Sequence, residues 1–282
     1  MNYLTSTLVF CALTASLTCS QAALIARYEL NESSGGALDS SGNGYDGTPA
    51  NAGSGRVYSQ PTVGAGTYGA INVSAGQAAA MGTSIDFGTD GSNFGNYNIG
   101  GAGQAAIDAL LEPGTGGNRI DGTMTVMAWI NLDNITGVQS IFSSVQGGGS
   151  DGWRFGTNGS GLRFTTLGAQ DFNQSASLTV GTWYHVAVTV NNDDITFYLN
   201  GNEIGNTTAT VNYIEEAAGF EVKLGGKSTG AENMFGRMDE VKVYDTALTQ
   251  GEIVLNAVPV PEPSTSGLFA VSFLGFLARR KR

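Results

Sequence analysis

The segment Gly181–Gly205, GTWYHVAVTVNNDDITFYLNGNEIG, predicts three consecutive β-strands. In Trp183–Val190 every second residue is apolar, and the alternation resumes in Ile195–Leu199. This period of two places one side of each strand against a hydrophobic core. The polar turn Asn191–Asp194 and the pair Asn200-Gly201 suit hairpin loops, because Asn and Gly tolerate positive φ. A meander of three strands with one apolar face needs a second sheet to cover it.

Other parts of the chain supply strands for that second sheet. The core side of the meander is predicted to hold Val186, Val188, Phe197 and Leu199, whereas Thr196 faces away. The same alternation predicts further strands over Ala23–Leu30, Thr123–Leu132, Val138–Ser143, Trp153–Phe155, Gly161–Thr166, Phe220–Leu224 and Arg237–Tyr244. The sequence therefore predicts an all-β fold, with two antiparallel sheets in a sandwich.

The segment Gly53–Gly117 is rich in Gly and Ala and gives weaker signals. Ala80–Phe87 predicts a strand and Gln104–Leu111 a short helix, and the remainder is expected to be long loop. Near the other end of the chain, Thr249 and Glu252 form a capping box that opens a short helix.

Three motifs resemble one protein family. They are W-x-H-V-A followed by F-Y-L-N-G within Trp183–Gly201, FGRMDEVKVYDTALTQGEI at Phe235–Ile253, and LDSSGNGYDG at Leu38–Gly47. Together they look like the hallmark of laminin-G-like, concanavalin A-like jelly-roll domains, over roughly residues 24–255. The resemblance implies a jelly roll whose last strand pairs beside its first. The family includes lectins, adhesion modules and enzymes, so the resemblance implies no single function.

The N-terminus predicts a secretory signal peptide over residues 1–22. Leu4–Leu17 is apolar, no charged side chain precedes Arg27, and small residues allow cleavage between Ala22 and Ala23. A helical signal segment would thus precede a domain of residues 23–257. Both cysteines lie in the first twenty residues, so the remaining chain can form no disulfide and no cysteine-based metal site.

The tail, residues 258–282, has three parts. The alternate prolines in Val258–Ser264 exclude a helix there, about fourteen apolar or small residues follow, and the chain ends in Arg279-Arg280-Lys281-Arg282. The triplet Pro261-Glu262-Pro263, a short hydrophobic helix and a basic end resemble the PEP-CTERM sorting signal of Gram-negative bacteria. The resemblance implies recognition by an exosortase, cleavage near the triplet, transient anchoring in the inner membrane, and export linked to exopolysaccharide.

Charge excludes a nucleic-acid-binding role. Removing residues 1–22 and 264–282 takes away four of the 13 basic residues and none of the 24 acidic ones, which leaves a net charge of −15. Such a domain repels nucleic acid and favours divalent cations.

The loop Asp39–Gly47 concentrates oxygen ligands in a chain bent by glycines, which suits a calcium ion. The position of the last EF-hand ligand is Ala50, which excludes an EF-hand. Laminin-G-like relatives often hold calcium between this loop and the closing motif, which implies Asp39 and Asp46 here, with Asp239. The alternative is a turn in which the Asp and Asn side chains cap their own backbone.

The sequence offers little for catalysis. The only histidine, His185, lies in the middle of a predicted strand and is expected to be structural. Neither Glu215-Glu216 nor Asp239-Glu240 has the spacing of the glucanases of this fold. Trp153, Tyr198 and Tyr213 could stack on sugar rings or belong to the core. We therefore expect an exported, non-catalytic domain that binds carbohydrate or protein. The alternatives are a structural component of the extracellular matrix without a discrete ligand, and a glycan-active enzyme.

Overall fold

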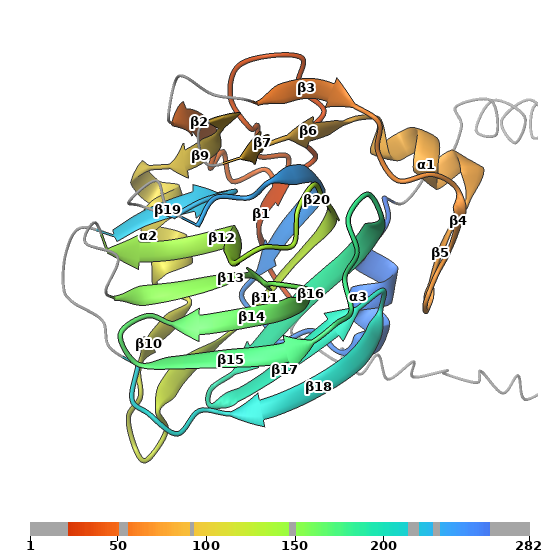
Figure 1. The fold of residues 1–282 in the computed structure, drawn as a ribbon. Coiled ribbons are helices and arrows are strands. Elements are labelled where there is room, and N and C mark those ends of the chain that lie inside the picture. The colour runs from red at the N-terminus through yellow and green to blue at the C-terminus, as the bar shows by residue number, and fades with distance from the viewer. Residues whose placement is uncertain are drawn as a thin grey trace, which may run out of the picture.

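In a computed structural model the chain forms two antiparallel sheets packed face to face (Figure 1). The structure describes residues 22–50, 56–90, 93–146, 151–213, 220–227 and 232–259. The predicted all-β jelly-roll sandwich is confirmed. The predicted signal helix and the predicted hydrophobic helix of the tail lie outside the described residues.

The first sheet is built around the predicted meander. Its order is β18 (Asn202–Thr208), β17 (Asp194–Leu199), β16 (Trp183–Asn191), β11 (Ile120–Leu132), β20 (Gly236–Tyr244), β6 (Ser84–Asp86) and β3 (Val57–Gln60). β1 (Leu24–Tyr28) also pairs with β20, and β10 (Leu111–Pro113) pairs with β11. The last long strand therefore lies beside the first, as the resemblance implied.

The second sheet covers the apolar side of the first. Its order is β15 (Gln170–Ser175), β14 (Gly161–Thr166), β13 (Gly152–Asn158), β12 (Val138–Gln146), β19 (Phe220–Leu224), β9 (Asn96–Ile99) and β2 (Gly47–Ala50). Two small hairpins do not pair with the strands of either sheet. One consists of β4 (Gly66–Tyr68) and β5 (Ile71–Val73), the other of β7 (Gly88–Asp90) and β8 (Asn93–Phe94).

The meander has the register that its turns predict. Leu199 pairs with Asn202 across Asn200 (φ 51°) and Gly201 (φ 75°), the two positive values that a tight hairpin needs. The predicted core side is also confirmed: Val186, Val188 and Phe197 are buried between the sheets, and Leu199 packs against them.

Aromatic residues fill much of the space between the sheets. Phe142, Trp153, Phe164 and Phe172 come from four neighbouring strands, and successive ring centroids are 6.1–6.3 Å apart. All four belong to one large buried cluster with the apolar side of the meander. This row of rings fixes which side of the second sheet faces inward, and therefore which side faces out.

The segment Gly53–Gly117 contains more regular structure than we expected. Its described part includes β3 to β9, α1 (Ala75–Met81) and α2 (Gly101–Asp108). The predicted strand Ala80–Phe87 is wrong in its first half, because the capping box of Ser74 and Gln77 opens α1 there and only Ser84–Asp86 pairs as a strand. The predicted helix Gln104–Leu111 begins and ends three residues earlier than expected. Glycine weakens propensity signals, and pairing with β20 and β19 overrides them.

At the other end of the domain, α3 (Gln250–Asn256) opens with the predicted capping box, in which Thr249 Oγ1 accepts from the backbone N–H of Glu252. The chain then lies against the outer side of the first sheet. There the Trp129 indole N–H donates to the carbonyl of Ala257 at 2.7 Å, and Val258 packs beside Trp129 in a small buried cluster. Val258, predicted to open the tail, therefore belongs to the folded body, and the adjoining Pro259 is buried too.

Among the residues that the structure describes, no helix is both long and apolar enough to cross a membrane.

Candidate functional site

The outer face of the second sheet carries a row of polar residues, which follows from the register. Asp171, Thr165, Arg154, Ser143 and Lys223 lie directly opposite one another on β15, β14, β13, β12 and β19. Opposed residues share a face, and the neighbouring row contains the inward aromatic rings. The polar row therefore points away from the core.

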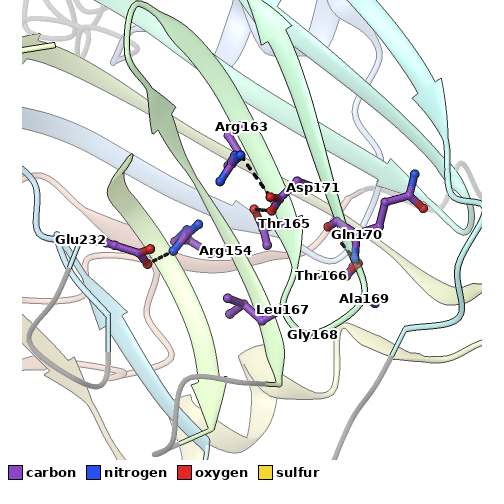
Figure 2. A pocket seen from close by; sticks show the side chains of 10 residues that line it. All are labelled: Arg154, Arg163, Thr165, Thr166, Leu167, Gly168, Ala169, Gln170, Asp171 and Glu232. Carbon is purple, nitrogen blue, oxygen red and sulfur yellow. Dashed lines mark hydrogen bonds and ion pairs between the residues drawn. The ribbon is translucent and has the colours of Figure 1, made fainter. Parts of the chain in front are cut away.

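A pocket of about 320 Å³ lies over this row, at the end of β13, β14 and β15 (Figure 2). It is lined by Arg154, Arg163, Thr165, Thr166, Leu167, Gly168, Ala169, Gln170, Asp171 and Glu232. A second polar hollow of about 310 Å³ continues along the same strands past Asn158, Asn173 and Ser175. We call the two hollows together the β14–β15 groove.

The charged side chains of the groove are held in place by one another. Arg163 Nη2 lies 3.1 Å from Asp171 Oδ2, and Thr165 Oγ1 donates to the other oxygen of that carboxylate at 2.9 Å (Figure 2). Arg154 pairs with Glu232 (Figure 2), which comes from the loop between β19 and β20. Arg163 Nε also donates to the Asn173 amide oxygen at 2.8 Å, which links the two hollows. The groove thus presents donors and acceptors whose orientation is fixed before any ligand arrives.

Burial and mutual repulsion weaken the protonated state of the cations here. Burial and then the charge of Arg163 lower the pKa of Arg154 to about 10, while Asp171 opposes the change. The pKa of Lys227 is also lowered, first by burial and then by the charge of Arg154. Arg163 and Lys227 therefore each lie within electrostatic reach of Arg154.

Sequence reasoning missed this groove. The hairpin of Trp153–Phe155 and Gly161–Thr166 was predicted and is confirmed as β13 and β14, but Gln170–Ser175 was not recognised as a strand. The sequence does contain a signal for it: Phe155 alternates with Arg154, and Phe164 alternates with Arg163 and Thr165. This alternation predicts strands with one aromatic side and one polar, solvent-facing side.

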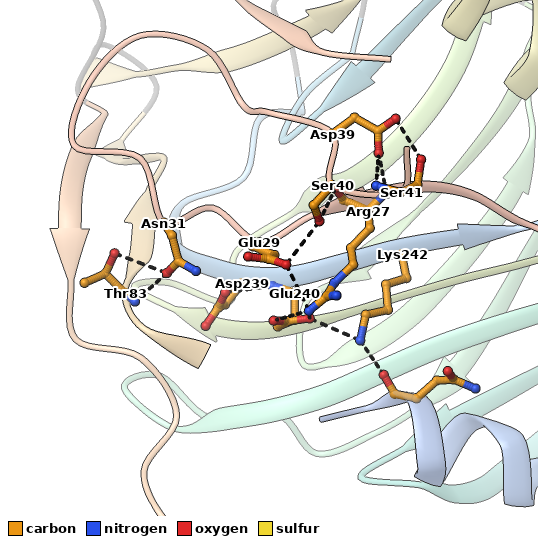
Figure 3. A network of polar contacts seen from close by, with 11 residues as sticks. Arg27, Glu29, Asn31, Asp39, Ser40, Ser41, Thr83, Asp239, Glu240 and Lys242 are labelled. Atoms are coloured by element: carbon orange, nitrogen blue, oxygen red, sulfur yellow. Dashed lines mark hydrogen bonds and ion pairs between the residues drawn. The ribbon is translucent and has the colours of Figure 1, made fainter. Parts of the chain in front are cut away.

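The predicted calcium loop is organised by Asp39 (Figure 3). One carboxylate oxygen accepts from the N–H groups of Arg27 and Ser41, and the other from the N–H of Tyr45 and the hydroxyl of Ser41, all at 2.8–2.9 Å. Burial raises the pKa of Asp39, but the N–H groups of Arg27, Tyr45 and Ser41 outweigh it, so the pKa is lowered. Each oxygen has its lone pairs occupied by hydrogens, which would repel a cation.

The other two predicted ligands do not complete a cation site. Asp46 accepts the N–H of Asp39 at 2.8 Å, which again closes the turn. Asp239 lies on β20 and accepts from the Thr62 hydroxyl and from the N–H of Glu240. The described residues contain no group of three His, Cys, Asp or Glu side chains that could hold a metal ion. These residues do not fit a calcium ion, and the hydrogen bonds match the alternative of a self-capping turn. Calcium binding stays an untested prediction of the sequence, and these contacts argue against it.

Asp239 belongs to a buried network on the outer side of the first sheet (Figure 3). Glu240 accepts from Arg27 at 3.1 Å and from Lys242 at 3.1 Å, and Lys242 also donates to the carbonyl of Asn256 at 2.6 Å. Burial raises the pKa of Asp239 well above its usual range, and the charge of Glu240 adds to this while Thr62 opposes it. The pair Asp239-Glu240 is covered and cannot reach a substrate, whereas Glu215-Glu216 lies outside the described residues.

The remaining candidates from the sequence are buried. His185 packs edge-on against Trp129 with ring centroids 5.3 Å apart, and burial followed by the charge of Lys242 lowers its pKa to about 3. Trp153, Tyr198 and Tyr213 are all buried and offer no ring face to a sugar.

Of the residues predicted for signal cleavage and sorting, the structure describes only Ala22 and Ala23. The N–H of Ala23 donates to the Asp245 carboxylate at 2.9 Å, and Ala22 packs lightly nearby. Pro261, Glu262, Pro263, Arg279 and Arg280 lie outside the described residues.

Comparisons with solved structures agree with the fold. The binding domain of botulinum neurotoxin DC, solved in complex with rat synaptotagmin II, superposes with a TM-score of 0.52 at 14% identity, covering 83% of this chain and 50% of that one. Domain 4 of AbnA, a GH43 extracellular arabinanase from Geobacillus stearothermophilus solved in complex with arabinotriose, gives 0.50 at 18% identity, covering 84% and 98%. At these identities the likeness concerns the fold alone.

Among curated proteins, human usherin is 32% identical over 81 residues, which are 27% of this chain and 2% of usherin. The chain therefore spans a very small part of that relative. Two sequence profiles also match, one described as the concanavalin A-like lectin/glucanases superfamily at residues 106–254 and the other as the PEP-CTERM protein-sorting motif at residues 259–282. The motif is a signal for export and implies processing by an exosortase. The superfamily match covers more than half of the chain, so the protein belongs to the concanavalin A-like lectin/glucanases superfamily and ends in a PEP-CTERM sorting motif.

Proposed function

We propose that this protein is an exported, non-catalytic domain that binds carbohydrate in the β14–β15 groove. The observation that carries the proposal is the set of preorganised polar groups there, in which Arg163, Thr165 and Asp171 hold one another through hydrogen bonds and an ion pair. Polar groups with fixed orientation lose little entropy when a ligand binds, and sugar hydroxyls both donate and accept. The two hollows in series leave room for more than one sugar residue.

The similar structures support this proposal at the level of the fold. The arabinanase domain was solved with arabinotriose, and the match to this chain extends over 98% of that domain. A domain of this shape therefore holds an oligosaccharide. The neurotoxin domain was solved with a protein partner, so a protein ligand for this chain is the competing form of a binding function.

Within the part of the chain that the structure describes, the state of the candidate catalytic residues favours binding over turnover. His185 is buried with a strongly lowered pKa, and Asp239 and Glu240 are buried, the first beside Thr62 and the second between Arg27 and Lys242. Glycoside hydrolysis needs two carboxyl groups that reach the same glycosidic bond. In the groove, Asp171 and Glu232 are each engaged by an arginine, which suits holding a ligand more than donating a proton.

The destination follows from the tail. Exosortase-type processing near Pro261-Glu262-Pro263 would release a protein held briefly in the inner membrane of a Gram-negative cell, and the chain would then reach the cell surface or the extracellular polymer. Exopolysaccharide made by the same cell is the carbohydrate that the protein would meet there first.

The test is a pull-down of the full chain on exopolysaccharide and on a panel of immobilised glycans. Binding to at least one glycan that is lost when Thr165→Val and Asn173→Ala are combined supports the proposal, because both side chains line the groove. Thr196→Val with Asn206→Ala, on the other sheet, is the matched control. Failure to bind any glycan favours a structural matrix component, and release of reducing sugar would show an enzyme.

A further inference from the structure

The basic residues of the domain are unevenly distributed. Residues 23–258 contain nine Lys and Arg side chains. Four of them gather on one face of the second sheet. They are Arg154, Arg163, Lys223 and Lys227. The rest of the domain is strongly acidic, so this face is where an anion meets the least repulsion.

The acidic residues in the groove do not fully balance these cations. A single carboxylate, that of Glu232, pairs with Arg154 and also lies 3.2 Å from the Lys227 ammonium. Asp171 pairs with Arg163 and also accepts a hydrogen bond from the Thr165 hydroxyl. Arg154 is almost completely buried, and its pKa is lowered by burial and by Arg163. A further negative charge among these three cations would relieve their repulsion.

The lining of the groove also disfavours a neutral sugar as its main ligand. Sites for neutral sugars commonly place an aromatic ring against the apolar face of the sugar. The ten residues drawn in Figure 2 include no aromatic side chain, and Leu167 is the largest apolar one. Recognition here must come from charged and polar contacts, and charge-assisted hydrogen bonds are the strongest of these.

We propose that the groove recognises the carboxylate groups of an acidic polysaccharide of the uronic-acid type, with Arg163 as the principal contact and Arg154 and Lys227 as supporting charges. Arg163 is suited to this role because 16% of its side-chain surface is exposed and its guanidinium has a planar donor fork that fits a carboxylate. The inference rests on the proposed function, since it names the class of carbohydrate for the same groove.

A pair of polymers that differ only in charge gives the test. Polygalacturonate and its highly methyl-esterified form have the same backbone, but the ester lacks the carboxylate. The full chain, in a neutral detergent and with EDTA to prevent gelling of the polymer, should bind polygalacturonate at least about tenfold more tightly than the ester. Binding should also weaken as salt is raised from 50 to 300 mM.

Two variants move the affinity in opposite directions. Arg163→Gln should weaken binding to polygalacturonate by about tenfold. Asp171→Asn should strengthen it, because the competing carboxylate is neutralised while the acceptor for Thr165 remains. Arg119→Gln and Glu112→Gln make the same changes in net charge at exposed positions outside the groove and should leave binding unchanged.

The outcomes separate this inference from the proposed function. Equal binding of both polymers, with no effect of Arg163→Gln, would overturn the inference while leaving a neutral-glycan function standing. Binding of neither polymer nor any glycan of the panel would overturn both. Equal effects of Arg163→Gln and Arg119→Gln would show a general charge effect, and would overturn the assignment of the groove.

Discussion

The boundary between the folded body and the sorting tail gives a prediction whose magnitude follows from three contacts. Truncation after Leu255 removes the carbonyl of Asn256 that accepts from Lys242, the carbonyl of Ala257 that accepts from the Trp129 indole, and the buried side chain of Val258. Truncation after Pro259 removes none of these contacts. The two truncations differ by four residues, so their comparison isolates the anchored segment.

The cost of the shorter truncation can be estimated contact by contact. A buried indole N–H left without an acceptor costs about 1–3 kcal/mol, and a hydrogen bond to a charged group contributes about 1.5–3 kcal/mol. Exposing a buried Val side chain costs about 1.5–3 kcal/mol. The loss is therefore about 4–9 kcal/mol, against a total stability of about 5–15 kcal/mol for a domain. Since 1 kcal/mol shifts the melting temperature of a domain of this size by about 2–4 °C, we expect a decrease of at least about 8 °C.

The assay is thermal unfolding followed by near-UV circular dichroism, with differential scanning calorimetry as a second measure. The chain truncated after Pro259 should melt with the full chain, and the chain truncated after Leu255 should melt much earlier or not cooperatively. If both truncated chains melt at the temperature of the full chain, the role assigned to residues 256–259 is refuted. If both melt earlier than the full chain and to the same extent, the tail itself is part of the fold.

Three further predictions concern the core, the buried acid and the loop. Val188→Asp should abolish cooperative unfolding because it buries an unpaired charge, whereas Thr196→Asp on the outer side should be tolerated; equal damage at both would mean that the face assignment is wrong. Asp239→Asn should raise the melting temperature at pH 7–8 but not near pH 4. Because the pKa of Asp239 is raised in the fold, the stability that its protonated form contributes is lost as pH increases above the usual value of 3.8. A destabilising effect of the substitution at pH 8 would argue that the carboxylate is charged in the fold. Asp39→Ala should lower the melting temperature equally in calcium and in EDTA, since it leaves backbone N–H groups without an acceptor, and the wild type should melt alike in both; a wild-type melt that rises in calcium would show a metal site.

The sandwich could be predicted because its strands have local signals. The alternation in β16 and β17, the Asn200-Gly201 turn and the Thr249–Glu252 capping box each depend on neighbouring residues, and all are confirmed. The insert between β2 and β11 could not be predicted as well. Short elements such as β6 form because β20 and β3 pair with them, and pairing between residues about 150 positions apart leaves no local trace.

The candidate site was harder still. Asp39 and Asp46 were predicted as calcium ligands from the oxygen-rich loop and the family resemblance, but the structure uses their oxygens to cap backbone N–H groups. The groove instead unites Arg154, Arg163 and Glu232, which are up to 78 residues apart and share one face only through the register of β13, β14 and the β19–β20 loop. A single sequence shows that arginines alternate with phenylalanines, but it does not show that their outer sides meet.

The central claim is that carbohydrate binds in the β14–β15 groove, and a titration followed by backbone amide NMR tests it most directly. A ¹⁵N-labelled chain, truncated after Pro259, would be titrated with oligosaccharides from the glycan that it retains in the pull-down. We predict that the shifts cluster at β13, β14 and β15 and at Glu232, and that Thr165→Val combined with Asn173→Ala abolishes them. Shifts confined to the Asp39–Gly47 loop or to β16–β18, with β14 and β15 unchanged, would contradict the account.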